Sequence, residues 1–232
     1  MEQPIYEGKV KSVYDVPGDA QKVTMLFHDK VTAFEGARVD YPKDKGATCC
    51  LISALIFEKL EAAGIRTHYL ELPSLNTMLC RKVEIIPLEV ICRNYAAGSI
   101  VRETHLQEGM PIRPAIVEFY LKDDNKKDPI LTPDRVKLMG IETEPLIRIT
   151  NEINGQLQVL FNLIGLDLID FKVEFGRDAH GDLYLADEIS PDSMRLWKKG
   201  TKERFDKDLF RKDEGDIVTA YKDVLNKLRG LA

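Results

Sequence analysis

The sequence contains few of the residues that form metal sites and covalent cross-links. Only four of its 232 residues are cysteines and four are histidines. Cys49 and Cys50 are adjacent, and no pair of cysteines has the CxxC spacing of a zinc or redox motif. The histidines lack HExxH or other ligand-like spacing, which favours a structural or surface role for each. We therefore expect neither a cysteine-based metal site nor a disulfide framework.

Long apolar runs are also missing. No segment approaches the roughly 18 uninterrupted apolar residues of a membrane span, and residues 1–9 have no apolar stretch typical of a signal peptide. With 33 basic and 38 acidic side chains the net charge is −5, which disfavours general binding to nucleic acid. We expect a soluble protein of a reducing cytoplasm, a homo-oligomer with no nucleic-acid or membrane partner.

Three common catalytic motifs are absent as well. There is no GxSxG segment, so the sequence gives no support for a serine hydrolase. The GxGxxG fingerprint of dinucleotide folds and the GxxxxGK[ST] spacing of a P-loop are also missing. A nucleotide site in this chain would therefore have to be built from other segments.

Apolar periodicity predicts antiparallel strands with helices packed on them, which is an α+β fold. We expect strands in residues 6–14, 22–34 and 78–95, with a break at Pro87, and helices around residues 51–60, 144–164 and 216–228. Residues 168–189 have the pattern of a hairpin, and residues 98–134 are expected to be rich in loops.

The hairpin contains the most informative group of charged residues. Period two places Asp170, Lys172 and Glu174 on the strand face opposite Phe171 and its apolar neighbours. The returning strand ends in Ala-Asp-Glu, which would bring Asp187 close to them. Such a group of carboxylates needs positive charge, from Lys172 and from an ion such as Mg²⁺. The alternative is the solvated outer face of an edge strand.

Three further segments carry groups suited to phosphate. Residues 6–14 place Gly8, Lys9 and Lys11 on one strand, although a solvent-facing lysine pair is common. Residues 93–99 (RNYAAGS) could form a phosphate cradle or a plain tight turn. Residues 119–124, followed by Asp128, could supply a nucleotide contact and a metal ligand, or form only a solvated charge run.

Taken together, these segments resemble one family. The runs IPLEVICRNYAAGS (residues 86–99) and IDFKVEFG (residues 169–176) are similar to two signatures of SAICAR synthetase, and residues 6–14, 119–124 and 187–197 match in the expected order. The resemblance covers essentially the whole chain. It implies an ATP-dependent ligase of purine biosynthesis that joins L-aspartate to the carboxylate of CAIR, a carboxyaminoimidazole ribonucleotide, and releases SAICAR, ADP and phosphate.

The resemblance also implies roles for individual residues. The nucleotide would be bound by Gly8, Lys9, Lys11, Arg81, Val83, Lys122, Glu174 and Asp187. The ligands of Mg²⁺ would be Glu174, Asp187 and Asp128, and the catalytic groups Lys172, Asp170 and Asp128. CAIR would be bound by Arg93, Ser99, Lys172, Arg195 and Arg38. Two positions depart from the family pattern: Glu35 stands where an Asp is frequent, and Lys198 where an acidic residue is common.

The fold that the resemblance implies has two lobes with ATP between them. Residues 1–83 would form a small antiparallel-sheet domain, and residues 84–232 a larger α+β domain of ATP-grasp type. Two other functions remain open from the residues alone. The same groups could serve a small-molecule kinase that phosphorylates a hydroxyl, or a regulatory module that binds nucleotide without turnover.

Overall fold

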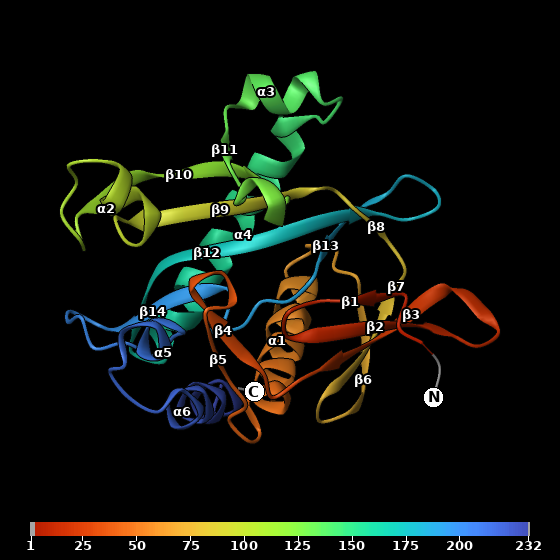
Figure 1. Cartoon of the computed structure of the whole chain (residues 1–232), viewed down its shortest axis with the longest axis horizontal. Helices are drawn as coiled ribbons and strands as arrows, with labels where there is room; N and C mark the ends of the chain where they lie inside the picture. Colours follow the sequence, from red (N-terminus) through yellow and green to blue (C-terminus); the bar gives the residue numbers. More distant parts are fainter. Residues whose placement is uncertain (1–2, 232) are drawn as a thin grey trace.

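The computed structural model describes residues 3–231, without the side chains of Glu35 and Asp124. The first two residues of the N-terminal segment, which we expect to carry no signal peptide, therefore lie outside it. Two antiparallel sheets dominate the fold, and helices pack on and between them (Figure 1). The predicted α+β class with two lobes is confirmed.

The small sheet is built from the N-terminal third of the chain. Its strand order is β1 (Tyr6–Glu7), β2 (Lys11–Val16), β3 (Asp19–Phe27), β7 (Thr77–Arg81) and β6 (Tyr69–Ser74), all antiparallel. The turn between β2 and β3 contains Gly18, whose φ of 81° suits glycine. On β3 the residues Val23, Met25 and Phe27 alternate into the core.

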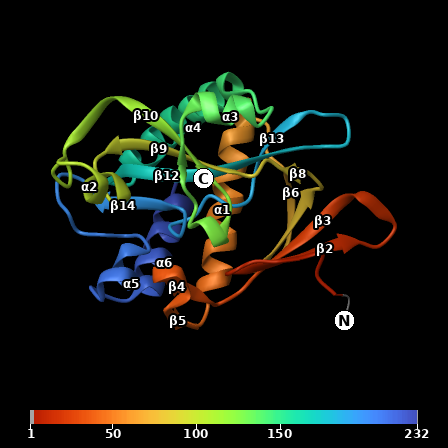
Figure 2. The ribbon, with the colours of Figure 1, turned by 45° about the horizontal axis from the view of Figure 1, so that its top comes forward.

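A hairpin and a long helix follow the first three strands. The hairpin consists of β4 (Val31–Ala33), the 3₁₀ turn η1 (Phe34–Gly36) and β5 (Arg38–Asp40). Helix α1 (Lys45–Ala62) contains the predicted helical segment and begins six residues before it. It lies between the two sheets and packs against the C-terminal helix (Figure 2). Its core residues Ile52, Ile56 and Phe57 are fully buried.

The large sheet has β12 at its centre. The strands are β8 (Glu84–Ile85), β9 (Leu88–Tyr95), β10 (Pro111–Leu121), β11 (Ile130–Leu131), β12 (Leu166–Arg177), β13 (Leu183–Ala186) and β14 (Met194–Lys198). Four of them, β8, β9, β13 and β14, pair with β12. The predicted hairpin is therefore confirmed as β12 and β13, but β12 is an interior strand. The alternative of a solvated edge strand is wrong.

Residues 98–134, which are predicted to be rich in loops, contain more regular structure than expected. They contain the eleven-residue strand β10, the short helix α2 (Ser99–Glu103), the turn η2 (Asp124–Lys126) and the start of α3 (Pro133–Leu138). The first half of β10 carries Pro111 and Pro114, which have no N–H to donate and hide the strand pattern. Its pairing with β9 is irregular there, between Pro111 and Ile116, and regular afterwards.

Three helices complete the large lobe and close the core. Helices α4 (Thr143–Leu163) and α6 (Ile217–Arg229) confirm the two predicted helices, and α5 (Asp208–Lys212) precedes α6. Asp216 caps α6 by accepting a hydrogen bond from the Val218 amide at 2.9 Å. None of the helices in the described part of the chain is long and apolar enough to cross a membrane.

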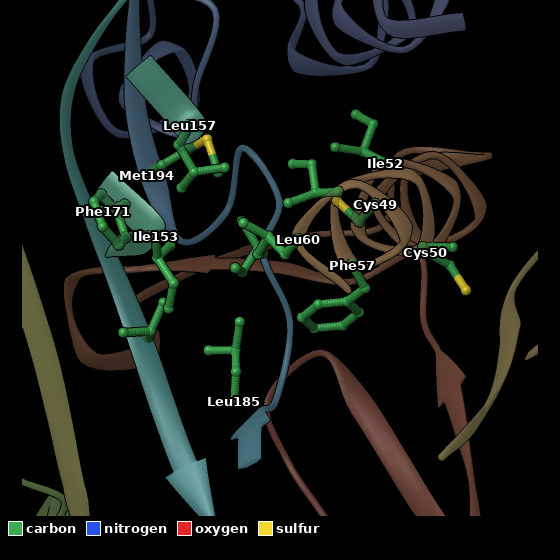
Figure 3. Close-up of a cluster of buried hydrophobic side chains, with 14 of the residues drawn as sticks. Cys49, Cys50, Ile52, Phe57, Leu60, Ile153, Leu157, Phe171, Leu185 and Met194 are labelled. Atoms are coloured by element: carbon green, nitrogen blue, oxygen red, sulfur yellow. The ribbon is translucent and has the colours of Figure 1, made fainter. Parts of the chain in front are cut away.

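One hydrophobic core joins the two lobes. It includes Met25 of the small sheet, Phe171 of β12 and Leu225 of α6. Figure 3 shows side chains of α1, among them Ile52 and Phe57, in the same cluster as Phe171 and Leu185 from the large sheet. The chain passes from one sheet to the other between Arg81 and Glu84, which is where the domain boundary is predicted. Because the core is continuous, the division into residues 1–83 and 84–232 stays a prediction.

Candidate active site

The lobes enclose a cleft of about 1020 Å³. Its walls come from β1, β2 and the segment between them, from β9 and β12, and from the residues that follow β13. Twelve predicted site residues line it: Gly8, Lys9, Lys11, Arg93, Ser99, Lys122, Asp128, Asp170, Lys172, Glu174, Asp187 and Arg195. The structure therefore brings together segments that are as far apart in the sequence as Gly8 and Arg195.

An acidic cluster interleaved with lysines forms one part of the cleft. Glu174 accepts hydrogen bonds from Lys172 at 2.9 Å and from Lys122 at 2.5 Å. Asp187 lies 2.7 Å from Lys11 Nζ and 3.9 Å from Lys172 Nζ. Lys172 thus lies between the two carboxylates, and Lys11 and Lys122 flank them on either side. This is the clustering that the hairpin pattern predicts.

The charges in this cluster stabilise one another. Burial alone would raise the pKa of Asp187, but Lys11 and Lys172 outweigh it and hold the pKa well below its usual range. Burial would lower the pKa of Lys172, yet Glu174, Glu89 and Asp187 raise it well above its ordinary value. Both groups therefore remain charged at neutral pH.

The local fold explains why Glu174 and Asp187 meet. Glu174 on β12 is paired with Ala186 on β13, so Asp187 is the first residue beyond that pair. Asp187 has a φ of 65°, in the left-handed region, which turns the chain at the end of β13. Glu174 is 2 % exposed, and its carboxylate contacts Lys122 and Lys172.

The donor chemistry of this cluster fits Mg²⁺. Glu174 and Asp187 offer only oxygen ligands, and one or two carboxylates completed by phosphates and water are the usual protein site for this ion. Asp128 lines the same cleft, and its Oδ1 accepts a hydrogen bond from the Asp123 amide at 2.8 Å. Across residues 3–231, no cluster of three or more His, Cys, Asp or Glu side chains forms a metal site on its own.

Two arginines converge on Asp170 in another part of the cleft. Arg93 Nη1 and Arg195 Nη1 both donate to Asp170 Oδ2, at 3.0 and 2.8 Å. Arg93, which is 1 % exposed, also donates to Glu118 at 2.6 Å and to Ser99 Oγ at 2.7 Å. The register of the sheet produces this cluster, since Asp170 pairs with Arg93 on β9 and with Arg195 on β14.

Comparison with known proteins agrees with this geometry. A family model described as SAICAR synthetase matches residues 4–228. The phosphoribosylaminoimidazole-succinocarboxamide synthase of Methanocaldococcus jannaschii is 44 % identical over 230 residues, which cover 97 % of this chain and 94 % of that protein.

The chain belongs to the SAICAR synthetase family.

Solved structures of this family have the same fold. A SAICAR synthetase in complex with ADP superposes with a TM-score of 0.93 at 39 % identity, covering 97 % of each chain. The phosphoribosylaminoimidazole-succinocarboxamide synthase of Ehrlichia chaffeensis gives a TM-score of 0.94 at 36 % identity, covering 98 % of each chain. The family resemblance seen in the sequence is thus confirmed.

One glycine of the family signature in residues 86–99 has a clear structural reason. Gly98 has φ 67° and ψ −126°, a backbone conformation that other residues rarely adopt. A Cβ atom at this position would also collide with the guanidinium group of Arg195. Gly98 therefore allows Arg195 to lie directly against the turn that leads to Ser99.

Three predicted site residues, Arg38, Arg81 and Val83, are not among the residues that line the cleft. Arg38 donates to the Phe210 carbonyl at 2.7 Å and to Asp213 at 2.8 Å, and its guanidinium lies over the Phe210 ring. It therefore ties the β4–β5 hairpin to α5. The guanidinium of Arg81 lies 4.9 Å from the centre of the Tyr184 ring, and Val83 is packed where a Cβ on Gly176 would collide.

The sequence departs from the family pattern at Lys198 and Glu35, and the structure describes the side chain of Lys198 only. Lys198 is paired with Glu203 at 3.0 Å on the exposed end of β14. The side chain of Glu35 lies outside the described part of the chain, although the backbone of its turn is described. The contact of Lys198 with Glu203 does not involve the clusters around Asp187 and Asp170.

Several cleft residues were missed by sequence reasoning. They are Glu89, Arg102, Glu188, Asp192, Lys207 and Arg211. Glu89 accepts from Lys172 at 3.1 Å, and Glu188 from Lys11 at 2.8 Å. Glu89 lies within the first signature and Glu188 beside Asp187, so both could have been chosen from position alone. The four-residue spacing of Lys207 and Arg211 would place them on one helical face, but nothing in the sequence puts that face at the cleft.

Proposed function

We propose that this chain joins L-aspartate to the carboxylate of CAIR with ATP and releases SAICAR, ADP and phosphate in purine biosynthesis. The proposal rests on membership of the SAICAR synthetase family over residues 4–228. The structural observation that carries it is the arrangement on β12. Asp170 holds the arginine cluster and Glu174 belongs to the acidic cluster, while Lys172 lies between them on the same strand face.

The chemistry accounts for both clusters. A carboxylate is a poor electrophile because attack on it would have to expel oxide. If a carboxylate oxygen attacks the γ-phosphorus of ATP, ADP leaves and an acyl phosphate forms. The aspartate amine then attacks the acyl carbon, and phosphate departs with that oxygen. Phosphoryl transfer of this kind depends on positioning and charge neutralisation more than on a protein nucleophile.

The acidic cluster and its lysines would bind the nucleotide phosphates. Lys9, Lys11 and Lys122 supply positive charge, and Gly8 allows the backbone to approach a phosphate closely. Glu174 and Asp187, with Asp128, would hold Mg²⁺, which neutralises phosphate charge when it is bound. The adenine would meet residues 81–85, including Arg81 and Val83, between the two sheets.

The arginine cluster would bind the 5′-phosphate of CAIR. Arg93 and Arg195 present guanidinium groups suited to a phosphate, and Ser99 adds a hydroxyl. Lys172 would then face the carboxylate of CAIR near the γ-phosphate. Along a strand, Asp170 and Glu174 are separated by roughly 13 Å. The two clusters can therefore hold opposite ends of one substrate and its phosphate donor.

The remaining expectations are part of the same proposal. We place the enzyme in the cytoplasm as a homo-oligomer with ATP and Mg²⁺ as its cofactors. We keep Arg38 among the residues proposed to act on the CAIR side of the site. In the structure it contacts α5 from the β4–β5 hairpin.

A substrate-omission experiment tests the proposed function. The purified protein is incubated with Mg²⁺ and ATP, and CAIR or L-aspartate is left out in turn while ADP and SAICAR are measured by chromatography. We expect SAICAR only when all three substrates are present, with one ADP released for each SAICAR. A phosphorylated hydroxyl product without amide would instead indicate a kinase, and nucleotide binding without turnover would indicate a regulatory module.

A further inference from the structure

We propose that His68 is a positioning residue that holds Asp187 in the conformation needed at the nucleotide site. His68 does not line the cleft, and its position in the sequence predicts only a structural or surface role. The inference rests on the proposed function in one respect only, which is the assignment of Asp187 as a Mg²⁺ ligand.

The backbone of His68 is anchored to β13, the strand that Asp187 directly follows. The His68 amide donates to the Leu185 carbonyl at 2.8 Å, and the Leu185 amide donates to the Arg66 carbonyl at 3.0 Å. Thr67 and Leu185 thus form an isolated parallel bridge. The same His68 accepts a hydrogen bond from the Arg81 amide at 2.6 Å. These bonds fix His68 at the junction of the two sheets. Its partner Leu185 lies two residues before the turn at Asp187.

The imidazole ring of His68 reaches this turn directly. Its Nε2 lies 3.1 Å from the carbonyl oxygen of Asp187. A carbonyl can only accept, so Nε2 must carry the hydrogen and donate it. His68 is 3 % exposed, and its ring packs edge-on against Phe57 with 5.5 Å between the ring centres. The same nitrogen lies 3.7 Å from Cys80 Sγ, a much weaker partner.

The backbone of Asp187 adopts a conformation that is uncommon outside glycine. Its φ of 65° is accessible to Asp and Asn at a lower cost than to other residues with a Cβ atom, and contacts from neighbouring groups stabilise it further. The side chain that leaves this turn places its carboxylate 2.7 Å from Lys11 and beside Lys172. A hydrogen bond to the carbonyl of the same residue fixes the peptide plane that follows it. We infer that His68 thereby sets the direction of the Asp187 carboxylate.

Three substitutions of His68 separate this role from simple packing. The amide nitrogen of Gln can occupy the place of Nε2, whereas that of Asn reaches only the place of Nδ1. Leu fills the volume beside Phe57 but donates nothing. For each variant, binding of ADP is measured by calorimetry with and without Mg²⁺, beside the KM values for ATP and CAIR and the melting temperature.

We expect His68→Leu and His68→Asn to weaken Mg²⁺-dependent ADP binding about tenfold or more, as loss of a partner behind a metal ligand does. The KM for CAIR should stay within about twofold, and His68→Gln should restore binding to within about threefold of the original protein. In an Asp187→Asn background, His68→Leu should have no further effect on Mg²⁺-dependent binding.

Equal binding by the Gln and Asn variants would overturn the proposal, and so would a uniform rise of both KM values. If the Leu variant does not fold, the comparison of Gln with Asn still decides the matter. Failure of the proposed ligase function would look different, because the original protein would bind ADP with Mg²⁺ but form no SAICAR.

Discussion

Lys11 of the small sheet lies 2.7 Å from the carboxylate of Asp187, which directly follows the last strand of the β12–β13 hairpin in the large sheet. This ion pair joins the two lobes across the cleft, and both side chains are largely buried. Glu188 lies 2.8 Å from the same ammonium group. The proposed nucleotide site therefore has its charges paired within the protein, and phosphates and Mg²⁺ would enter an environment of matched lysines and carboxylates.

Replacement of Asp187 by Asn tests the role of its charge. Asn tolerates the left-handed backbone at this position, and Lys11 keeps Glu188 as a partner, so we expect the fold to be retained. Turnover should fall by about a hundredfold or more, because Asp187 is a proposed ligand of the Mg²⁺ ion that would neutralise phosphate charge. Steady-state rates at several Mg²⁺ concentrations measure the effect. The control is Asp223→Asn on the exposed side of α6, and activity within tenfold of the original would contradict the metal assignment.

Replacement of Arg195 by Lys tests the arginine cluster. Lysine can keep the charge but cannot reach Asp170 and Asp208 at once, as Arg195 does through Nη1 and Nε. We expect the KM for CAIR to rise about tenfold, with the KM for ATP changed by less than threefold. Initial rates with each substrate varied give both values. Arg148→Lys on the exposed face of α4 serves as the control, and an equal rise of both KM values would refute the assignment.

Replacement of Gly98 by Ala tests whether the close approach of Arg195 to this glycine is needed for CAIR binding. Both Gly98 and Gly181 have positive φ, but a Cβ on Gly181 meets no atom within 4 Å, whereas one on Gly98 collides with Arg195. Gly181→Ala should cost about 1–2 kcal/mol of unfolding free energy from the strained backbone. Gly98→Ala should cost more than Gly181→Ala, because the collision with Arg195 adds to the backbone strain. Only Gly98→Ala should also raise the KM for CAIR. Urea unfolding and substrate kinetics on the two variants check this, and an unchanged KM in Gly98→Ala would refute it.

A buried carboxyl group predicts how stability depends on pH. Asp206 is fully buried, and burial together with the nearby Asp208 raises its pKa to about 7, against the hydrogen bonds that it accepts from the Leu196 and Asp208 amides. The native state therefore binds a proton that the unfolded chain releases near pH 4. The contribution of Asp206 to stability is greatest below pH 4 and is lost as the pH rises towards 7, by up to about 1.4 kcal/mol per pH unit.

The comparison with Asp206→Asn isolates this contribution. The unfolding free energy of the original protein should fall relative to that of the variant between pH 4 and pH 7 and run parallel to it above pH 7.5. Urea unfolding at half-unit steps of pH measures the difference. A difference that does not change with pH would mean that Asp206 is ionised in the native state throughout this range.

The sequence predicts the acidic cluster well because the cluster follows local rules. Period two places Asp170, Lys172 and Glu174 on one face of β12, and the short return of β13 brings Asp187 to the same place. No long-range information is needed for this. The assignment of these groups to phosphate, metal and CAIR came from the family resemblance, since charge alternation alone also fits a solvated strand.

Features that depend on the order of strands in the sheet could not be predicted from local sequence patterns. The pairing of Asp170 with Arg93 and Arg195 requires the register of β9, β12 and β14, which lie far apart along the chain. Strand β10 was missed because two prolines obscure its first half. Arg38 illustrates a further limit, because its partners at Phe210 and Asp213 are more than 170 residues away. Contacts between lobes are set by packing of the whole core, and no local pattern encodes them.

The fate of one oxygen atom tests the central claim, which is that ATP activates the carboxylate of CAIR. CAIR labelled with ¹⁸O in that carboxylate is converted with ATP and L-aspartate, and the released phosphate is examined by mass spectrometry. We predict that each phosphate carries one ¹⁸O atom, because the oxygen that attacks the γ-phosphorus leaves with it when the amide forms. Unlabelled phosphate formed alongside SAICAR would contradict the account, because phosphate would then have departed without ever being joined to the carboxylate.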